Sequence, residues 1–91
     1  MTLQQLRYVT TVAKMGSMNE AAKQLFVSQP SLSGAIKELE KELNITIFFR
    51  NTKGVVLTPE GQEFLGYARQ VLNQVDLLEE KYSDEVNLRK H

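Results

Sequence analysis

A cluster of polar side chains near the middle of the chain has the chemistry of a nucleic-acid contact. Hydroxyl and amide groups at the start of a helix can reach base edges and phosphates, and the backbone N–H groups there favour anions. A serine or glutamine can also simply cap or solvate a helix, and for Ser28 alone that plainer explanation is preferred. Taken together, the cluster favours DNA: it comprises Ser28, Gln29, Ser31, Ser33 and, one turn later, Lys37.

Two short helices separated by a tight break must position this cluster. Ser17 and Glu20 have the spacing of a capping box, which starts the first helix. Ser28 is a good N-cap for the second, and Pro30 falls in its first turn, where a missing N–H is tolerated. The apolar residues recur at steps of three and four on both sides of the break, so residues 17–43 predict a helix-turn-helix. They are Ala21, Ala22 and Leu25, then Leu32, Ala35, Ile36, Leu39 and Leu43.

Two details of this segment carry their own expectations. Phe26 lies near the turn, and because a bulky residue at positive φ is unfavourable, a negative φ is expected, with the ring acting as a lid on the core. The stretch Lys37–Leu43 alternates charges and is interpreted as a solvated helical surface. Upstream, residues 2–15 predict a helix that Thr2 caps and Gly16 ends. Its expected buried stripe is Leu3, Leu6, Val9, Val12 and Ala13.

A hairpin is expected after the second helix of the pair, which Asn44 ends. Ile45, Ile47 and Phe49 alternate as in a strand, and residues 55–57 form a second one. The intervening turn is polar and cationic, which predicts a wing whose Arg50 and Lys53 reach phosphates or a narrow minor groove. Lys53 alone would be an ordinary loop lysine.

The last element is a long helix. Thr58, Pro59 and Glu60 start it, and a helix over residues 59–82 would be about 36 Å long. Its apolar residues follow a heptad seam too long for so small a head to cover, which predicts pairing with a second copy. Phe64 and Leu65 are also expected to pack on the chain's own head, and residues 83–91 to be polar and frayed. The expected dimerisation residues are Phe64, Ala68, Val71, Leu72, Val75, Leu78 and Tyr82.

The resulting fold class is mainly α: a winged helix-turn-helix head over residues 1–57, made of three helices and a two-stranded wing, followed by a dimerisation and linker helix over 58–91. The 91 residues contain no cysteine, and the one histidine, His91, is the last residue. No metal, cofactor or enzymatic activity is expected, and no membrane segment or signal peptide pattern is present, so a cytoplasmic protein is expected.

The charge is unevenly distributed. The net charge is zero, but residues 1–57 carry seven cations and four acids, while 58–91 carry four cations and seven acids. A head of +3 is weakly basic for DNA, so affinity is expected to come from a dimer and to depend on salt.

Six motifs in order resemble the N-terminal DNA-binding region of LysR-type transcriptional regulators: LRYVTTVA, GSMNEAAKQL, VSQPSLS, IKELEKEL, FFR and LTPEG. The resemblance covers Leu3 to about Leu78. It implies promoter binding as dimers or tetramers, with a small-molecule effector sensed by a C-terminal domain that this chain lacks. The chain is therefore expected to be either a fragment of a longer regulator or a stand-alone domain, and a fragment is favoured because the acidic seam ends without a terminating structure. It also implies a major-groove role for Ser28, Gln29, Pro30, Ser31 and Ser33, and a backbone or minor-groove role for Arg50, Thr52 and Lys53.

Two positions depart from the family's pattern. Gly34 stands where many relatives have a larger polar residue, so a base contact is expected to be missing, and Lys53 stands where arginine is common. The alternative function is a protein-interaction module in which the winged head docks a partner and the long helix forms a coiled coil. RNA binding stays open, although no aromatic stacking platform on a sheet is present.

Overall fold

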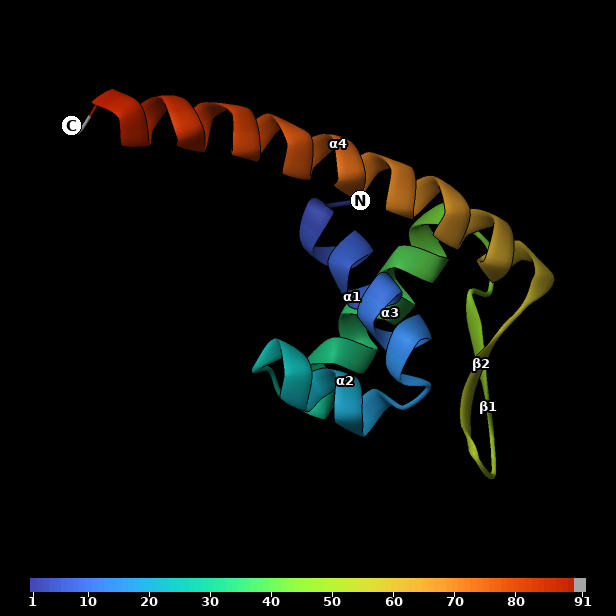
Figure 1. Ribbon diagram of the computed structural model, residues 1–91. Coiled ribbons are helices and arrows are strands. Elements are labelled where there is room, and N and C mark those ends of the chain that lie inside the picture. The colour runs from blue at the N-terminus through green and yellow to red at the C-terminus, as the bar shows by residue number, and fades with distance from the viewer. Residues whose placement is uncertain (90–91) are drawn as a thin grey trace.

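The computed structural model describes the backbone of residues 1–89 and the side chains of residues 1–83. Three helices form the head: α1 (Leu3–Met15), α2 (Met18–Leu25) and α3 (Gln29–Leu43). An antiparallel hairpin of β1 (Phe48–Asn51) and β2 (Gly54–Leu57) follows, and then the long α4 (Pro59–Arg89). Figure 1 shows α4 lying across one end of the head and extending beyond it, with the hairpin projecting on one side as a wing. This is the expected winged helix-turn-helix with a long last helix.

The helix boundaries follow the capping residues. Thr2 forms a complete capping box with Gln5, Gly16 ends α1 at φ 67°, and Ser28 accepts the Ser31 N–H at 3.2 Å. Ser17 accepts the Glu20 N–H, as expected. The Glu20 carboxylate lies 3.6 Å from Lys23, so it neutralises a neighbouring charge on α2.

The core between the three helices is built from the predicted apolar rows. Ala21 and Ala22 are buried where α2 meets its neighbours, and the small side chains allow this close packing. Leu32, Ile36 and Leu39 of α3 are buried on the facing side. In α1 the stripe is shifted from the expectation: Tyr8 is buried, and Leu3 is 45% exposed because it lies in the first turn at the edge of the head.

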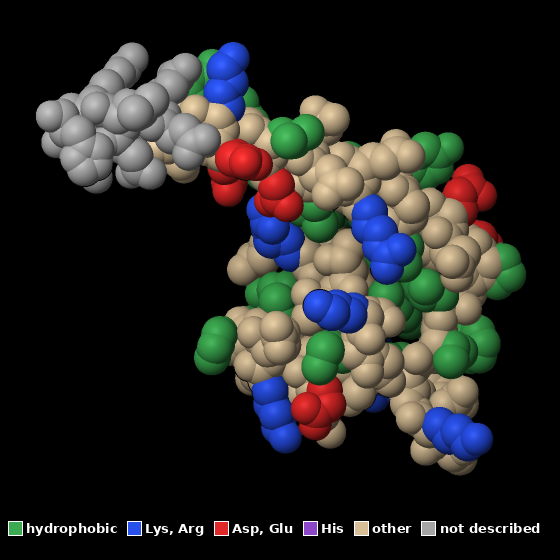
Figure 2. Space-filling model, in the orientation of Figure 1, with side chains coloured by type: hydrophobic (Ala, Val, Ile, Leu, Met, Phe, Trp, Pro, Cys, Tyr) green, Lys and Arg blue, Asp and Glu red, His purple; other side chains and the backbone are tan. Residues whose placement is uncertain are grey.

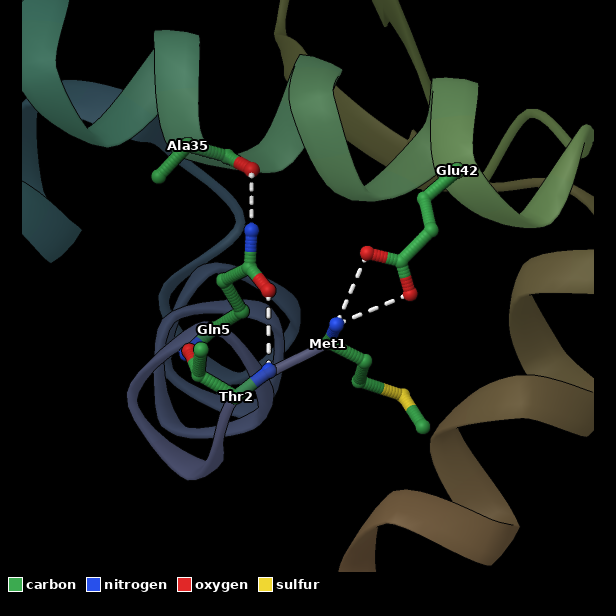
Figure 3. Close-up of polar contacts among 5 residues, drawn as sticks. All are labelled: Met1, Thr2, Gln5, Ala35 and Glu42. Carbon is green, nitrogen blue, oxygen red and sulfur yellow. Dashed lines mark hydrogen bonds and ion pairs between the residues drawn. The ribbon is translucent and has the colours of Figure 1, made fainter.

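Polar contacts at the chain start hold α1 against α3 (Figure 3). The Met1 amino group lies 2.7 and 2.8 Å from the two carboxylate oxygens of Glu42. The Gln5 amide accepts from the Thr2 N–H at 2.9 Å and donates to the Ala35 carbonyl at 3.3 Å. The same side chain therefore completes the cap of α1 and contacts α3.

The expectation for Phe26 was wrong in both respects. Its φ is +58° and its side chain is 94% exposed, so it neither keeps a negative φ nor covers the core. The left-handed conformation ends α2, because it lets the Phe26 N–H donate to the carbonyls of Ala22 and Lys23. The geometry of the tight turn decides the conformation here, against the preference of the residue type.

The wing is displaced along the sequence from the predicted strand. β1 begins at Phe48, so Ile45 and Ile47 precede it; Ile47 is fully buried and Phe49 is 50% exposed. The prediction that Ile45, Ile47 and Phe49 share one strand was therefore wrong. Strand pairing places Phe49 opposite the exposed Val56, while Phe48 is buried in the head core.

Backbone contacts fix the wing to the head. The Val55 N–H donates to the Gly16 carbonyl at 3.2 Å. Gly54 has φ +141°, and a Cβ there would lie 2.3 Å from the same carbonyl oxygen. This close approach therefore requires glycine at position 54.

Glu40 also holds the wing, contrary to the interpretation of Lys37–Leu43 as purely solvated. Its Oε2 accepts the N–H groups of Ile47 at 2.6 Å and Phe48 at 3.3 Å. At the other end of the hairpin, the Thr58 hydroxyl accepts the Gly61 N–H at 2.8 Å and contacts the carbonyls of Thr46 and Ile47. α3, the wing and α4 are thus joined at one junction.

α4 divides into a covered and an uncovered part. Leu65 lies in the head core, and Ala68 and Leu72 pack with Leu6 of α1, with Phe64 beside them. Beyond that contact, Leu77, Leu78 and Tyr82 are 58, 59 and 53% exposed. The helix continues through Ser83, its expected end, to Arg89, so fraying from residue 83 does not appear in the described backbone. Residues 90 and 91, including His91, lie outside the described residues.

Candidate nucleic-acid interface

A groove between α2, α3 and the wing brings together residues from three parts of the sequence. Gln29 comes from the first turn of α3, and the wing contributes residues 50–55, of which Arg50, Thr52 and Lys53 are exposed. The start of α2 closes the groove with Ser17, Met18 and Asn19. Tertiary packing therefore places one end of α3 and one side of the wing along the same concave surface.

The serines at the start of α3 differ in their hydrogen bonds and in their exposure. Ser28 accepts the Ser31 N–H, and its hydroxyl also donates to Ser31 Oγ at 2.8 Å, so it is engaged as a cap. Ser31 and Pro30 are exposed, whereas Ser33 is half-buried. Lys37 is exposed one turn further along α3, near Ser33 and Arg50. Ser28 is exposed as well, so the capping hydroxyl and the Ser31 hydroxyl form one bonded pair on the surface.

Arg50 connects the wing to α3. Its Nη2 donates to Ser33 Oγ at 3.1 Å, which spans 17 residues of sequence. A guanidinium has five N–H donors, so most of them stay free for another acceptor. At the tip, Asn51 Oδ1 accepts the Lys53 N–H at 2.9 Å and shapes the turn. The wing thus presents a pre-positioned guanidinium and an exposed ammonium.

Sequence reasoning did not include Asn19 among the candidates. It is exposed in the first turn of α2 and lines the groove beside Gln29 and the wing. Because Ser17 caps α2, Asn19 lies at a helix start, where polar groups can face an anion. The capping signal at Ser17 was visible in the sequence, but its proximity to the wing depends on the packing of α2 on α1.

Basic side chains are dispersed on the face shown in Figure 2. Lys and Arg lie at separate points across the head and on α4, and acidic side chains lie on α4 and at the lower edge of the head. Among the described residues, no group of three or more acidic or histidine side chains could hold a metal ion. The described helices include none with both the length and the apolar character of a membrane span. The basic side chains on this face are therefore spread out, not gathered in one patch.

The predicted dimerisation residues fall into two sets. Phe64, Ala68 and Leu72 face the chain's own α1. Val71, Leu78 and Tyr82 are exposed, and Val75 is half-buried. The heptad spacing therefore combines an intramolecular contact with a separate uncovered face further along α4.

Three packed helices followed by a two-stranded wing define the winged helix-turn-helix class. The family model described as "Bacterial regulatory helix-turn-helix protein, lysR family" matches residues 3–62, and the chain belongs to this family. A probable RuBisCO transcriptional regulator of Guillardia theta is 45% identical over 75 residues, which are 82% of this chain and 24% of that protein. The chain thus spans about a quarter of that relative's length.

Solved structures of the same family superpose closely. The DNA-binding domain of BenM, in a complex with catB site 1 DNA, has a TM-score of 0.88 at 37% identity, covering 94% of this chain and 97% of that one. The DNA-binding domain of CbnR in a DNA complex has a TM-score of 0.85 at 34% identity, covering 94 and 99%. The resemblance inferred from the six motifs is therefore confirmed.

Proposed function

We propose that this chain binds double-stranded promoter DNA sequence-specifically, as the DNA-binding region of a LysR-type transcriptional regulator. α3 enters the major groove, and residues 50–54 of the wing contact the backbone or minor groove. The observation that carries this proposal is the groove shared by Gln29 of α3 and the wing, beside which Arg50 donates to Ser33 of α3. The similarity to domains solved with DNA supports it.

Within this proposal the residues have different roles. Gln29 and Ser33 read base edges, Ser31 and Lys37 contact bases or phosphates, and Pro30 shapes the approaching end of α3. Arg50, Thr52 and Lys53 contact the backbone, and Ser28 acts mainly by capping α3. The proposal includes transcription regulation in the cytoplasm as the role of this DNA binding.

The proposal includes a homodimer through α4. The exposed residues Val71, Leu78 and Tyr82 would be covered by the same helix of a second copy, while the head covers Phe64, Ala68 and Leu72. Two heads related by a two-fold axis require a pseudo-palindromic site, with half-sites one helical turn or a multiple apart. A weakly basic head makes this pairing important, because each copy neutralises few phosphates.

Selection of bound duplexes from a random pool, followed by titration at fixed salt, tests DNA binding. Gln29→Ala should weaken binding to the selected duplex by about 1–3 kcal/mol and relax the base preference at one position of the site. Gln24→Ala is the control, because Gln24 is an exposed glutamine of α2 that does not line the groove. Lys53→Ala should weaken binding to duplexes of every sequence and reduce the dependence of the binding constant on salt concentration. Lys41→Ala is its control, because Lys41 is an exposed lysine near the C-terminal end of α3.

Sedimentation tests the dimer separately. Leu78→Asp should yield monomers with a folded head, because Leu78 is 59% exposed and outside the head core. A dimer that persists in this variant would exclude the proposed α4 contact. Robust dimerisation with no shift of any duplex at low salt would instead support the protein-interaction module.

A further inference from the structure

The corner between α2 and α3 carries an aromatic side chain that the head does not use. Phe26 is 94% exposed, so its ring makes almost no contact within the chain. Other exposed apolar side chains of the head and wing keep part of their surface covered: Leu3 and Phe49 are 45 and 50% exposed. The ring at the corner is therefore available to something outside the chain.

The backbone at Phe26 is also unfavourable for its residue type. Each helix of the head ends in a left-handed residue, which is Gly16 at φ 67°, Phe26 at φ 58° and Asn44 at φ 55°. Glycine and asparagine tolerate this conformation, whereas a bulky side chain is disfavoured there. The bonds that end α2 come from the backbone N–H of Phe26, so they would form equally well with either of those residues. The fold therefore has no need of a ring at this corner, and strained residues of this kind concentrate where ligands bind.

The corner adjoins the end of α3 that is proposed to enter the major groove. Phe26 precedes Gln29 by three residues, so their Cα atoms are at most about 11 Å apart. The major groove is about 12 Å wide, and the sugar-phosphate backbones form its two walls. When Gln29 lies at the base edges, Phe26 is therefore within reach of a wall. Figure 1 shows the corner and the wing at opposite sides of the head, so the two would contact different stretches of backbone.

We infer that the ring of Phe26 packs against a deoxyribose at the wall of the major groove, as a further DNA contact of this chain. This inference rests on the proposed function. Sugar carbons offer apolar surface to an exposed ring, and a contact with the backbone carries no sequence information. The corner has little free charge to offer a phosphate instead, because Lys23, one turn earlier, lies 3.6 Å from the Glu20 carboxylate. The contact is therefore apolar, insensitive to salt and the same for every duplex.

Phe26→Asn in the complete chain tests the inference, because it removes the ring and suits the left-handed backbone. It should weaken binding about fivefold, both to the selected duplex and to a mixed-sequence duplex at low salt, if about 40 Å² of apolar burial is lost. The dependence of the binding constant on salt should stay that of the parent, since no phosphate contact is lost. The melting temperature should not fall. Phe26→Tyr keeps the ring and should bind like the parent, as should Leu3→Asn, which changes an exposed apolar residue away from the groove.

The outcomes separate the two proposals. If the parent chain selects no duplex, the proposed function fails before the ring is tested. If the parent binds and Phe26→Asn binds equally well, the ring contact is overturned while DNA binding stands. A loss confined to one base pair of the selected site, or accompanied by a weaker salt dependence, would also overturn it, because the residue would then act on a base or on phosphate contacts. An equal loss in Phe26→Tyr would exclude the ring as the contacting group.

Discussion

Replacing Glu40 by alanine should destabilise the head and release the wing. Glu40 is the residue of α3 whose carboxylate oxygen accepts two backbone N–H groups from the α3–β1 connection, at 2.6 and 3.3 Å. Ile47, which donates the shorter bond, is fully buried, so water cannot replace the lost acceptor there. Its amide would be left unpaired in the core.

The magnitude follows from these two bonds. A hydrogen bond to a charged acceptor contributes about 1.5–3 kcal/mol, and leaving a buried donor unpaired costs a similar amount. The 3.3 Å bond from Phe48 adds less because it is long. Together they predict a loss of about 2–4 kcal/mol in the free energy of unfolding for Glu40→Ala. Glu40→Gln retains an acceptor oxygen without the charge and should lose roughly half of this.

Urea denaturation at one fixed protein concentration measures this loss, because the proposed dimer would make apparent stability depend on concentration. Glu38→Ala is the control: Glu38 is an exposed glutamate on the same helix, and its removal should change stability by less than about 0.5 kcal/mol. Equal stability of Glu40→Ala and Glu38→Ala would refute the assignment of Glu40 as the anchor of the wing.

Two other substitutions test the backbone geometry in opposite directions. Gly54→Ala should lower the free energy of unfolding by about 2–4 kcal/mol, measured by thermal or urea unfolding. Position 54 has φ +141°, and the added Cβ would lie 2.3 Å from the Gly16 carbonyl oxygen. Unchanged stability of the variant would show that the wing attachment is dispensable. Phe26→Asn should stabilise by about 0.5–1 kcal/mol, since asparagine tolerates the left-handed conformation and the ring, 94% exposed, makes little contact. A lower melting temperature for Phe26→Asn would mean that the exposed ring contributes to folding.

Local sequence signals predicted the helices well. Thr2, Ser17 and Ser28 each cap the helix expected of them, and Gly16 and Asn44 end theirs at positive φ. These signals act within about four residues, so they can be interpreted without knowing the fold. The six family motifs added the arrangement of these helices, because they indicated a known winged helix-turn-helix family.

Side-chain partners across the fold were not predictable in the same way. The pairing of Arg50 with Ser33 and the anchoring of Ile47 by Glu40 join distant elements and depend on where the wing lies. Alternation suggested one face for Ile47 and Phe49, but β1 begins only at Phe48, and Ile47 is buried while Phe49 is exposed. Asn19 likewise belongs to the groove only because the packing of α2 on α1 brings the start of α2 near the wing.

The sequence by itself determined which segments are helical, where α1, α2 and α3 begin and end, and the family to which the chain belongs, because caps, breakers and apolar spacing are local properties. The tertiary structure alone decided that Phe26 adopts a left-handed conformation in solvent, that the apolar row of α4 splits between its own head and an open face, and that Glu40 accepts two N–H groups at the start of the wing. These outcomes depend on competition for space between elements, and no short stretch of sequence contains that information.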